Sequence, residues 1–249
     1  MSDYNRGFAR SVPAQADMSV DAGLRSFMLG VYNKVALGLL LSAGIAFLTG
    51  AYPPVRNLMY VVTPDGRFGG YTLIGMIAAF GPLALILFSS FAMRNPSPRS
   101  SGILYWAIVS MIGASMGVLV LVYTGASIFQ TFLITAASFG ALSLFGYTTK
   151  KDLGPIGSFL IIGLFGLMIA SIVNIFLQAP VMSFIINAAG VLIFAGLIAY
   201  DTQRLKMSYY QMGGDQTAMG VATNYGALSL YLNFINLFQF LLALFGDRR

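Results

Sequence analysis

The stretch LGPIGSFLIIGLFGLMIASIVNIFLQAPVMSFIINAAGVLIFAGLIAY, residues 153–200, contains no charged residue. A helix needs about 20 apolar residues to cross the hydrocarbon core of a bilayer, so this stretch is long enough for two crossings. Its clearest break, Gln178-Ala179-Pro180, lies near the middle and is typical of a turn. The stretch therefore predicts a hairpin of two transmembrane helices.

Further stretches without charge cover residues 35–55, 68–93, 101–149 and 216–246. The third is long enough for two crossings and each of the others for one, which gives seven in total. The sequence predicts an all-α integral membrane protein, a seven-transmembrane-helix bundle. We expect the spans at 35–52, 71–93, 102–123, 127–147, 156–177, 181–200 and 223–245.

Composition agrees with this class, because 57% of the 249 residues are hydrophobic and only 9% are charged. A soluble domain carries about 25% charged residues, so an ordinary soluble protein is excluded. The polar residues 1–34 are expected to form an N-terminal cytoplasmic tail before the transmembrane domain, residues 35–249. The helical spacing of Leu24, Phe27, Met28 and Val31 predicts an amphipathic helix along the membrane surface, whereas residues 1–20 are equally compatible with a disordered tail.

The distribution of Lys and Arg predicts the orientation of the chain. With a cytoplasmic N-terminus, the inside segments hold ten of these cations and the outside segments hold four. Cytoplasmic segments carry the excess of Lys and Arg, so we expect the N-terminus inside and the C-terminus outside. The terminal pair Arg248 and Arg249 opposes this assignment, and a last segment that re-entered the membrane would place that pair inside.

The missing residue types exclude several kinds of chemistry. The chain has no Cys and no His, and all eight of its acidic residues are Asp. It therefore lacks a thiolate nucleophile, an imidazole base and the usual zinc ligands. The expected last span holds no Lys for a retinal Schiff base, and no Walker motif is present. We expect neither an enzyme nor a resident cofactor.

The last span carries the clearest candidate polar face. Ser229, Asn233 and Asn236 recur at i, i+4 and i+7, with Gln239 at the edge of the same face. Lipid cannot satisfy amide side chains, so this face should point into the bundle, with the other six helices around it. The spacing is compatible with interhelical hydrogen bonds and equally with a polar track for an ion or a proton.

Asp201 is the candidate acid. It directly follows the apolar run 192–200, where an acidic residue at a helix C-terminus opposes the helix dipole. One interpretation is a solvated boundary residue beside Arg204. The other is a functional acid, which is the usual role of an acidic residue inside a membrane.

Several motifs, taken together, resemble one family of membrane proteins. They are Val122-Tyr123-Thr124-Gly125, Gly146-Tyr147-Thr148-Thr149-Lys150-Lys151-Asp152-Leu153, Ile169-Ala170-Ser171-Ile172-Val173-Asn174-Ile175-Phe176, Tyr200-Asp201-Thr202-Gln203, and Ala227-Leu228-Ser229-Leu230-Tyr231-Leu232-Asn233-Phe234-Ile235-Asn236-Leu237-Phe238. This family is the Bax inhibitor-1 family, also called the transmembrane Bax inhibitor motif or YccA-like family, and its bacterial branch is the most similar. The resemblance implies a seven-helix bundle with a central last helix, a location in the bacterial inner membrane and a pH-sensitive calcium leak.

The resemblance also implies a site. In well-studied members, an aspartate that ends helix six and an aspartate in helix seven form a hydrogen-bonded pair near the cytosolic side, and an arginine after helix two can engage one of them. By motif, Asp201 matches the first aspartate and Arg94 matches the arginine. The position of the second aspartate is occupied here by Asn233.

Asn233 changes the expected activity. Two close carboxylates titrate as a coupled pair, whereas an Asp–Asn pair has only one titratable group. Calcium prefers several oxygen ligands with compensating charge, and this pair offers one charge at most. We therefore expect a cation leak gated by Asp201 and Arg94 and lined by the Asn233 face. Its permeation by calcium should be weaker, and its pH dependence altered, relative to members with two aspartates.

Two other functions remain open. The chain can be a regulatory membrane protein that binds partners such as a membrane-bound protease, with the 1–34 tail as the contact element. A proton-coupled transporter is less favoured, because the chain has one candidate acid and no detectable inverted repeat.

Overall fold

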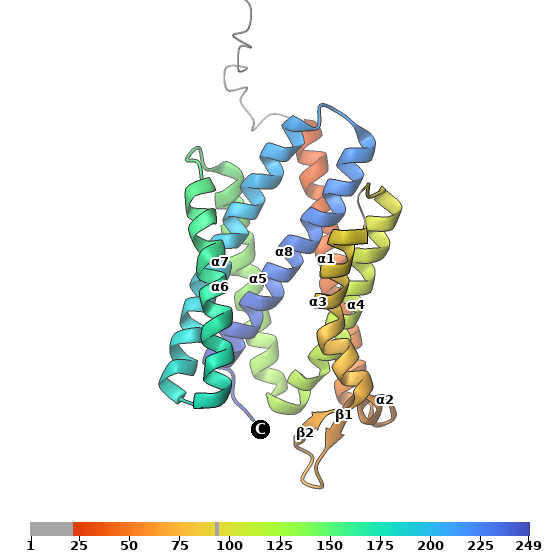
Figure 1. The fold of residues 1–249 in the computed structure, drawn as a ribbon, viewed down its shortest axis with the longest axis vertical. Coiled ribbons are helices and arrows are strands. Elements are labelled where there is room, and N and C mark those ends of the chain that lie inside the picture. Colours follow the sequence, from red (N-terminus) through yellow and green to blue (C-terminus); the bar gives the residue numbers. More distant parts are fainter. Residues whose placement is uncertain (1–21, 93–94) are drawn as a thin grey trace, which may run out of the picture.

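A computed structural model describes residues 22–92 and 95–249, and these residues form a bundle of long helices (Figure 1). Seven of the described helices are long and apolar enough to cross a membrane, which confirms the predicted all-α membrane fold. They are α1 (Ala22–Ala51), α3 (Leu73–Ala92), α4 (Pro98–Val122), α5 (Gly125–Thr148), α6 (Gly154–Leu177), α7 (Pro180–Gln211) and α8 (Gln216–Phe245). The short helix α2 (Pro53–Met59) and a hairpin of β1 (Tyr60–Val62) and β2 (Phe68–Tyr71) connect α1 to α3.

Local sequence signals define several helix ends. Ser97 and Ser100 form a capping box at the start of α4, in which each hydroxyl accepts a hydrogen bond from the backbone N–H of the other residue. The turn predicted at Gln178-Ala179-Pro180 separates α6 from α7. Gln178 adopts a left-handed conformation with φ of 49°, and Pro180 starts the next helix with its fixed φ.

Three helices extend by seven or more residues beyond the predicted spans. Helix α1 begins at Ala22 rather than at residue 35, α7 continues to Gln211 rather than ending at 200, and α8 begins at Gln216 rather than at 223. The predicted limits followed the first charged or polar residues, which mark where a helix leaves the lipid and not where its backbone hydrogen bonding stops.

The surface helix expected around Leu24 and Phe27 is instead the first part of α1. Both side chains are buried in the main apolar core, and the Phe27 ring packs 5.6 Å from the ring of Tyr209 on α7. The predicted helix is therefore confirmed, but the apolar face of this helix packs against protein and not against the membrane surface.

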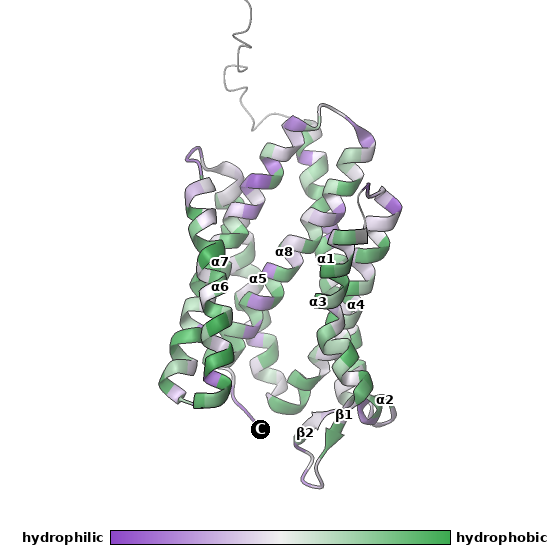
Figure 2. Cartoon of the chain, viewed as in Figure 1, coloured by the Kyte–Doolittle hydropathy of each residue, from purple (hydrophilic) through white to green (hydrophobic). Residues whose placement is uncertain are grey.

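Helix α8 lies at the centre of the bundle, as predicted for the last helix. It packs against α1, α4, α5 and α7, and a larger share of its span is buried than of any other. The side chains of Leu230, Tyr231 and Leu242 are completely buried. Figure 2 shows hydrophilic residues along α8, whereas α6 is mainly hydrophobic.

The expected ring of six helices around α8 is wrong in detail. Four helices form the main contacts of α8, while α3 packs on α4 and α6 packs on α7 at the periphery. The peripheral helices expose many large apolar side chains, for example Phe80, Phe91, Ile162 and Phe176. These side chains are suited to lipid, which explains why α3 and α6 need little protein around them.

The described C-terminal residues lie at the end of the bundle where α4 connects to α5 (Figure 1). The backbone N–H of Thr124 donates to the carbonyl of Asp247 at 3.0 Å, and that of Arg249 donates to the carbonyl of Val122 at 2.9 Å. Helix α8 therefore runs the full length of the bundle and does not turn back. The start of α1 lies at the opposite end, but which end faces the cytoplasm stays a prediction from the Lys and Arg distribution.

Tyr60 in the hairpin provides a test of packing outside the spans. Its ring is 1% exposed, and its hydroxyl donates to the carbonyls of Ala114 at 2.6 Å and Ser115 at 3.1 Å. Burial raises the pKa of Tyr60 to about 12. Because the folded-state pKa lies above the unfolded value, the stability that this group contributes is present below pH 10 and is lost between about pH 10 and 12.

We expect Tyr60→Phe to lower the free energy of unfolding by on the order of 1 kcal/mol at pH 8, because the hydrogen bond that the hydroxyl shares between the two carbonyls is lost. The variant should also lose part of the decline in stability above pH 10. Denaturant unfolding in detergent micelles from pH 8 to 11.5 measures both effects, with Tyr52→Phe, at an exposed position, as the control. An unchanged decline in Tyr60→Phe would contradict the assignment.

Candidate functional site

Asp201 on α7 contacts α8 through one carboxylate oxygen. Its Oδ2 accepts hydrogen bonds from the Ser229 hydroxyl at 2.5 Å and from the Asn233 side-chain amide at 2.8 Å. Ser229 and Asn233 lie one helical turn apart, which aims both donors at one oxygen. Asp201 is 5% exposed and Asn233 is 6% exposed, so this cluster lies inside the bundle.

The other carboxylate oxygen, Oδ1, forms an ion pair with Arg204 at 3.1 Å. The Arg204 side chain is half exposed, whereas that of Asp201 is nearly buried. Asp201 is therefore not the solvated residue at a helix end that its sequence position suggested. Helix α7 continues past it to Gln211, and its carboxylate points inward to α8 while Arg204 neutralises it from the outside.

Arg94 lies outside the described residues, so its engagement of Asp201 stays a prediction. Among the described residues, the cation paired with Asp201 is Arg204, which follows it by one turn of the same helix. An i,i+3 pair of this kind forms locally and is worth little when it is exposed. The two donors from α8, the part-buried Ser229 and the buried Asn233, connect different helices, so they are the contacts through which Asp201 holds the fold.

The polar face of the last helix divides into two parts. Ser229 and Asn233 point to Asp201, but the amide of Asn236 donates to the carbonyl of Leu232 in its own helix at 2.8 Å. Asn236 lines a separate cavity of about 270 Å³, and Gln239 is exposed. The predicted continuous polar face is therefore not a single interior surface.

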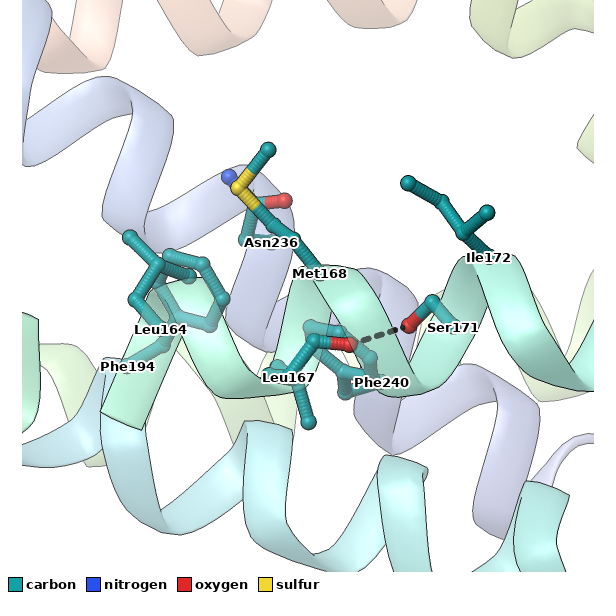
Figure 3. A pocket seen from close by; sticks show the side chains of 8 residues that line it. All are labelled: Leu164, Leu167, Met168, Ser171, Ile172, Phe194, Asn236 and Phe240. Atoms are coloured by element: carbon teal, nitrogen blue, oxygen red, sulfur yellow. Dashed lines mark hydrogen bonds between the residues drawn. The ribbon is translucent and has the colours of Figure 1, made fainter. Parts of the chain in front are cut away.

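The cavity beside Asn236 is mainly apolar (Figure 3). Side chains from α6, α7 and α8 line it, and the Ser171 hydroxyl in its wall donates to the carbonyl of Leu167. Met168 and Ile172 are about half exposed, so the cavity lies near the lipid-facing surface. Its lining residues are Leu164, Leu167, Met168, Ser171, Ile172, Phe194, Asn236 and Phe240.

The buried side chains of α8 beyond Asn233 are apolar. They are Phe234, Ile235, Leu237, Phe238, Leu241 and Leu242. A charged ion is strongly disfavoured among such side chains. The described conformation therefore has the Asp201 cluster near the middle of α8 and a mainly apolar barrier along the part of α8 that follows it.

Sequence reasoning missed a second polar cluster on α8. Asn224 is 4% exposed, and its amide donates to the carbonyl of Pro98 and to the hydroxyl of Ser101, both at 2.8 Å. Its side-chain oxygen accepts a hydrogen bond from the Lys34 ammonium of α1. Asn224 precedes Asn233 by nine residues, which places the two amides on opposite faces of α8 at about 100° per residue. The sequence signal for this cluster is an amide, Asn224, within an apolar segment. Its partner Lys34 falls in the predicted tail, so the sequence did not indicate that the two residues meet.

The residues that follow Asp201 also have partners that sequence spacing did not reveal. Gln203 accepts a hydrogen bond from the Leu153 N–H and donates to the Lys151 carbonyl, both at 2.8 Å. Lys206 is 6% exposed and donates to the carbonyl of Tyr147 at the end of α5 at 2.6 Å. The side chains of Gln203 and Lys206 thus form hydrogen bonds with backbone groups of the motif 146–153.

This geometry defines a multi-pass α-helical membrane protein in which the central last helix holds a buried carboxylate of the preceding helix. Residues 24–249 match the model of the family described as Inhibitor of apoptosis-promoting Bax1. The chain belongs to this Bax inhibitor-1 family, which confirms the resemblance in its motifs.

Bacterial relatives match over most of the chain. An uncharacterized protein from Caulobacter vibrioides is 64% identical over the full length of both chains, and the uncharacterized protein RP147 from Rickettsia prowazekii is 39% identical over the same coverage. The inner membrane protein YbhL from Escherichia coli is 38% identical over 92% of this chain and 94% of its own.

Proposed function

We propose that the chain is a pH-sensitive cation leak of the bacterial inner membrane, in which Asp201 locks α7 to α8. The observation that carries this proposal is that both oxygens of the Asp201 carboxylate already have partners within the protein. One oxygen accepts two donors from α8 and the other pairs with Arg204. A carboxylate engaged in this way acts as a clamp between helices rather than as a ligand for a passing ion.

Protonation of Asp201 is the proposed trigger. Hydrogen bonds to a charged acceptor are about twice as strong as neutral ones, so protonation weakens the contacts with Ser229 and Asn233. It also removes the ion pair with Arg204. The weakened clamp then allows α7 and α8 to separate, which admits water past the apolar barrier. Because Asn233 does not titrate, one proton controls the clamp rather than a coupled pair.

The same cluster supports a limited role for calcium, as a permeant ion and not as a resident cofactor. A calcium ion binds six to eight oxygen ligands, often including several carboxylates. Asp201 is the single carboxylate of this cluster, and Asn233 contributes no charge. We propose that the leak favours monovalent cations over calcium.

The test is ion flux through purified protein in liposomes, measured for calcium and potassium across a pH series. We expect Asp201→Asn to leak with little pH dependence, because its clamp cannot change charge. We expect Asn233→Asp to increase calcium flux and to broaden the pH dependence. Asp65→Asn, an exposed change in the β1–β2 turn, should behave as wild type. Equal leaks with the same pH profile for wild type and Asp201→Asn would reject the site.

The regulatory alternative uses residues 1–34 as the contact element; residues 22–34 form the first part of α1, and residues 1–21 lie outside the part of the chain that the structure describes. It stays a proposal for a protein that binds a membrane-bound protease or another membrane protein. Deletion of residues 1–20 separates the two functions. Ion flux that stays intact when the deletion abolishes partner association supports the leak as an independent activity. Wild-type protein that binds a partner through residues 1–20 but conducts no more than empty liposomes supports the regulator.

A further inference from the structure

Lys34 of α1 places a part-buried positive charge against α8, the helix that also contacts Asp201. Its ammonium donates to the Asn224 side chain of α8 and lies 5.3 Å from the centre of the Tyr105 ring and 5.8 Å from that of Trp106. Asn224 is itself held by α4 through Pro98 and Ser101. The ammonium is thus fixed between α1, α4 and α8 by several contacts.

No carboxylate of the described residues lies within ion-pair distance of Lys34, and the ion pair found among them joins Arg204 to Asp201. The rings of Tyr105 and Trp106 and the oxygen of Asn224 stabilise a cation without neutralising it. Within residues 22–92 and 95–249, the charge of Lys34 is therefore held against α8 without a carboxylate to neutralise it. The buried lysine, Lys206, donates to a carbonyl at the C-terminal end of α5, where the helix dipole offsets its charge.

Lys34 and Asp201 contact α8 at nearby levels. Asn224 precedes Ser229 by five residues, a rise of about 7.5 Å along the helix axis. Asn224 holds the cation on one face of α8, whereas Ser229 and Asn233 hold the anion on the other. Since a helix with its side chains is about 10–12 Å wide, this width and the axial rise together place a route past Asp201 about 12 Å from the Lys34 ammonium.

We propose that Lys34 sets the charge selectivity of the leak by repelling cations, and divalent cations most. This inference rests on the proposed leak and extends it to a residue outside the Asp201 cluster. At about 12 Å and an effective dielectric constant of about 20, Coulomb's law predicts a roughly tenfold depletion of a monovalent cation. The energy doubles for a divalent cation, so its depletion is the square of that factor, about 100-fold.

Flux of potassium, calcium and chloride through protein in liposomes tests this proposal. We expect Lys34→Met and Lys34→Gln to raise potassium flux about tenfold and calcium flux about 100-fold, and to lower chloride flux. Lys34→Arg keeps the charge and should retain the wild-type ratios. Asn224→Ala removes the holder but keeps the charge, so its ratio of calcium to potassium flux should stay within about twofold of wild type, whatever its total leak.

Two neutral variants are compared because Gln retains a hydrogen-bond donor for Asn224, whereas Met does not. A flux change that both variants share is therefore due to the lost charge and not to misfolding. An equal increase for all three ions in Lys34→Met, Lys34→Gln and Asn224→Ala would show a packing role and overturn the inference while leaving the leak intact. Flux that responds to Asp201→Asn but not to Lys34→Gln would overturn it as well. If wild type, Asn233→Asp and both neutral Lys34 variants conduct no more than empty liposomes, the proposed function and the inference both fail.

Discussion

Removal of both donors that α8 gives to Asp201, in the variant Ser229→Ala with Asn233→Leu, is expected to lower the free energy of unfolding by about 3 kcal/mol. Hydrogen bonds to a charged group contribute about 1.5–3 kcal/mol each, whereas neutral side-chain bonds in a membrane protein average about 0.6 kcal/mol. The charge of Asp201 therefore decides the size of the effect. Without its donors, the nearly buried carboxylate keeps only the half-exposed Arg204.

Denaturant unfolding in mixed micelles, followed by the fluorescence of the single tryptophan, Trp106, measures this loss. Asn236→Leu is the matched control on the same helix, because that amide bonds only to its own backbone. Its cost should stay below about 1 kcal/mol. Addition of Asp201→Leu to the double variant should recover much of the loss, since the unpaired charge is then removed. A similar loss in control and double variant would contradict a charged clamp.

Gly146→Ala is expected to destabilise the protein by about 2–3 kcal/mol, because α5 and α7 touch backbone to backbone at this position. A methyl group on Gly146 would lie 2.2 Å from the carbonyl oxygen of Ala199 and 2.9 Å from its Cα. Backbone atoms cannot move aside as a flexible side chain does, so α7 must shift. Ala199 precedes Asp201 by two residues, and we expect the shift to alter the pH dependence of the leak as well.

Gly140 on the same helix provides the control. A Cβ there meets nothing within 4 Å, and the position is exposed. Gly140→Ala should be neutral or stabilising by up to about 1 kcal/mol, since glycine weakens a helix interior relative to alanine. The same unfolding measurement compares the two variants. Equal free energies of unfolding for Gly146→Ala and Gly140→Ala would show that the close contact between α5 and α7 does not limit the stability of the protein.

The helices could be counted from the sequence, whereas their ends could not. A charge inside lipid is costly, so the gaps between charged residues report how often the chain crosses a membrane. The start of α1 and the end of α7 lie beyond those gaps, because backbone hydrogen bonds continue where a helix enters water. Lys34 was consequently assigned to a tail, although it lies inside α1.

The site could be predicted only where a family motif or a helical spacing indicated its residues. Asp201 and Asn233 followed from the family motif, and Ser229 from the spacing of the last span. The split of that face, with Asn236 turned to a peripheral cavity, depended on which helices surround α8. The pairing of Lys34 with Asn224 joins residues far apart in the sequence, and no local pattern specifies such a contact.

By itself, the sequence determined the class of the protein, its seven apolar spans, its family and the polar character of its last helix. These properties depend on the transfer of individual side chains between water and lipid, which is a local quantity. The tertiary structure decided that Asp201 is clamped by Ser229 and Asn233, that Arg204 is its described cation and that Lys34 stands on the opposite face of α8. Those choices depend on the rotation and depth of each helix against its neighbours, which only the packing of the whole bundle sets.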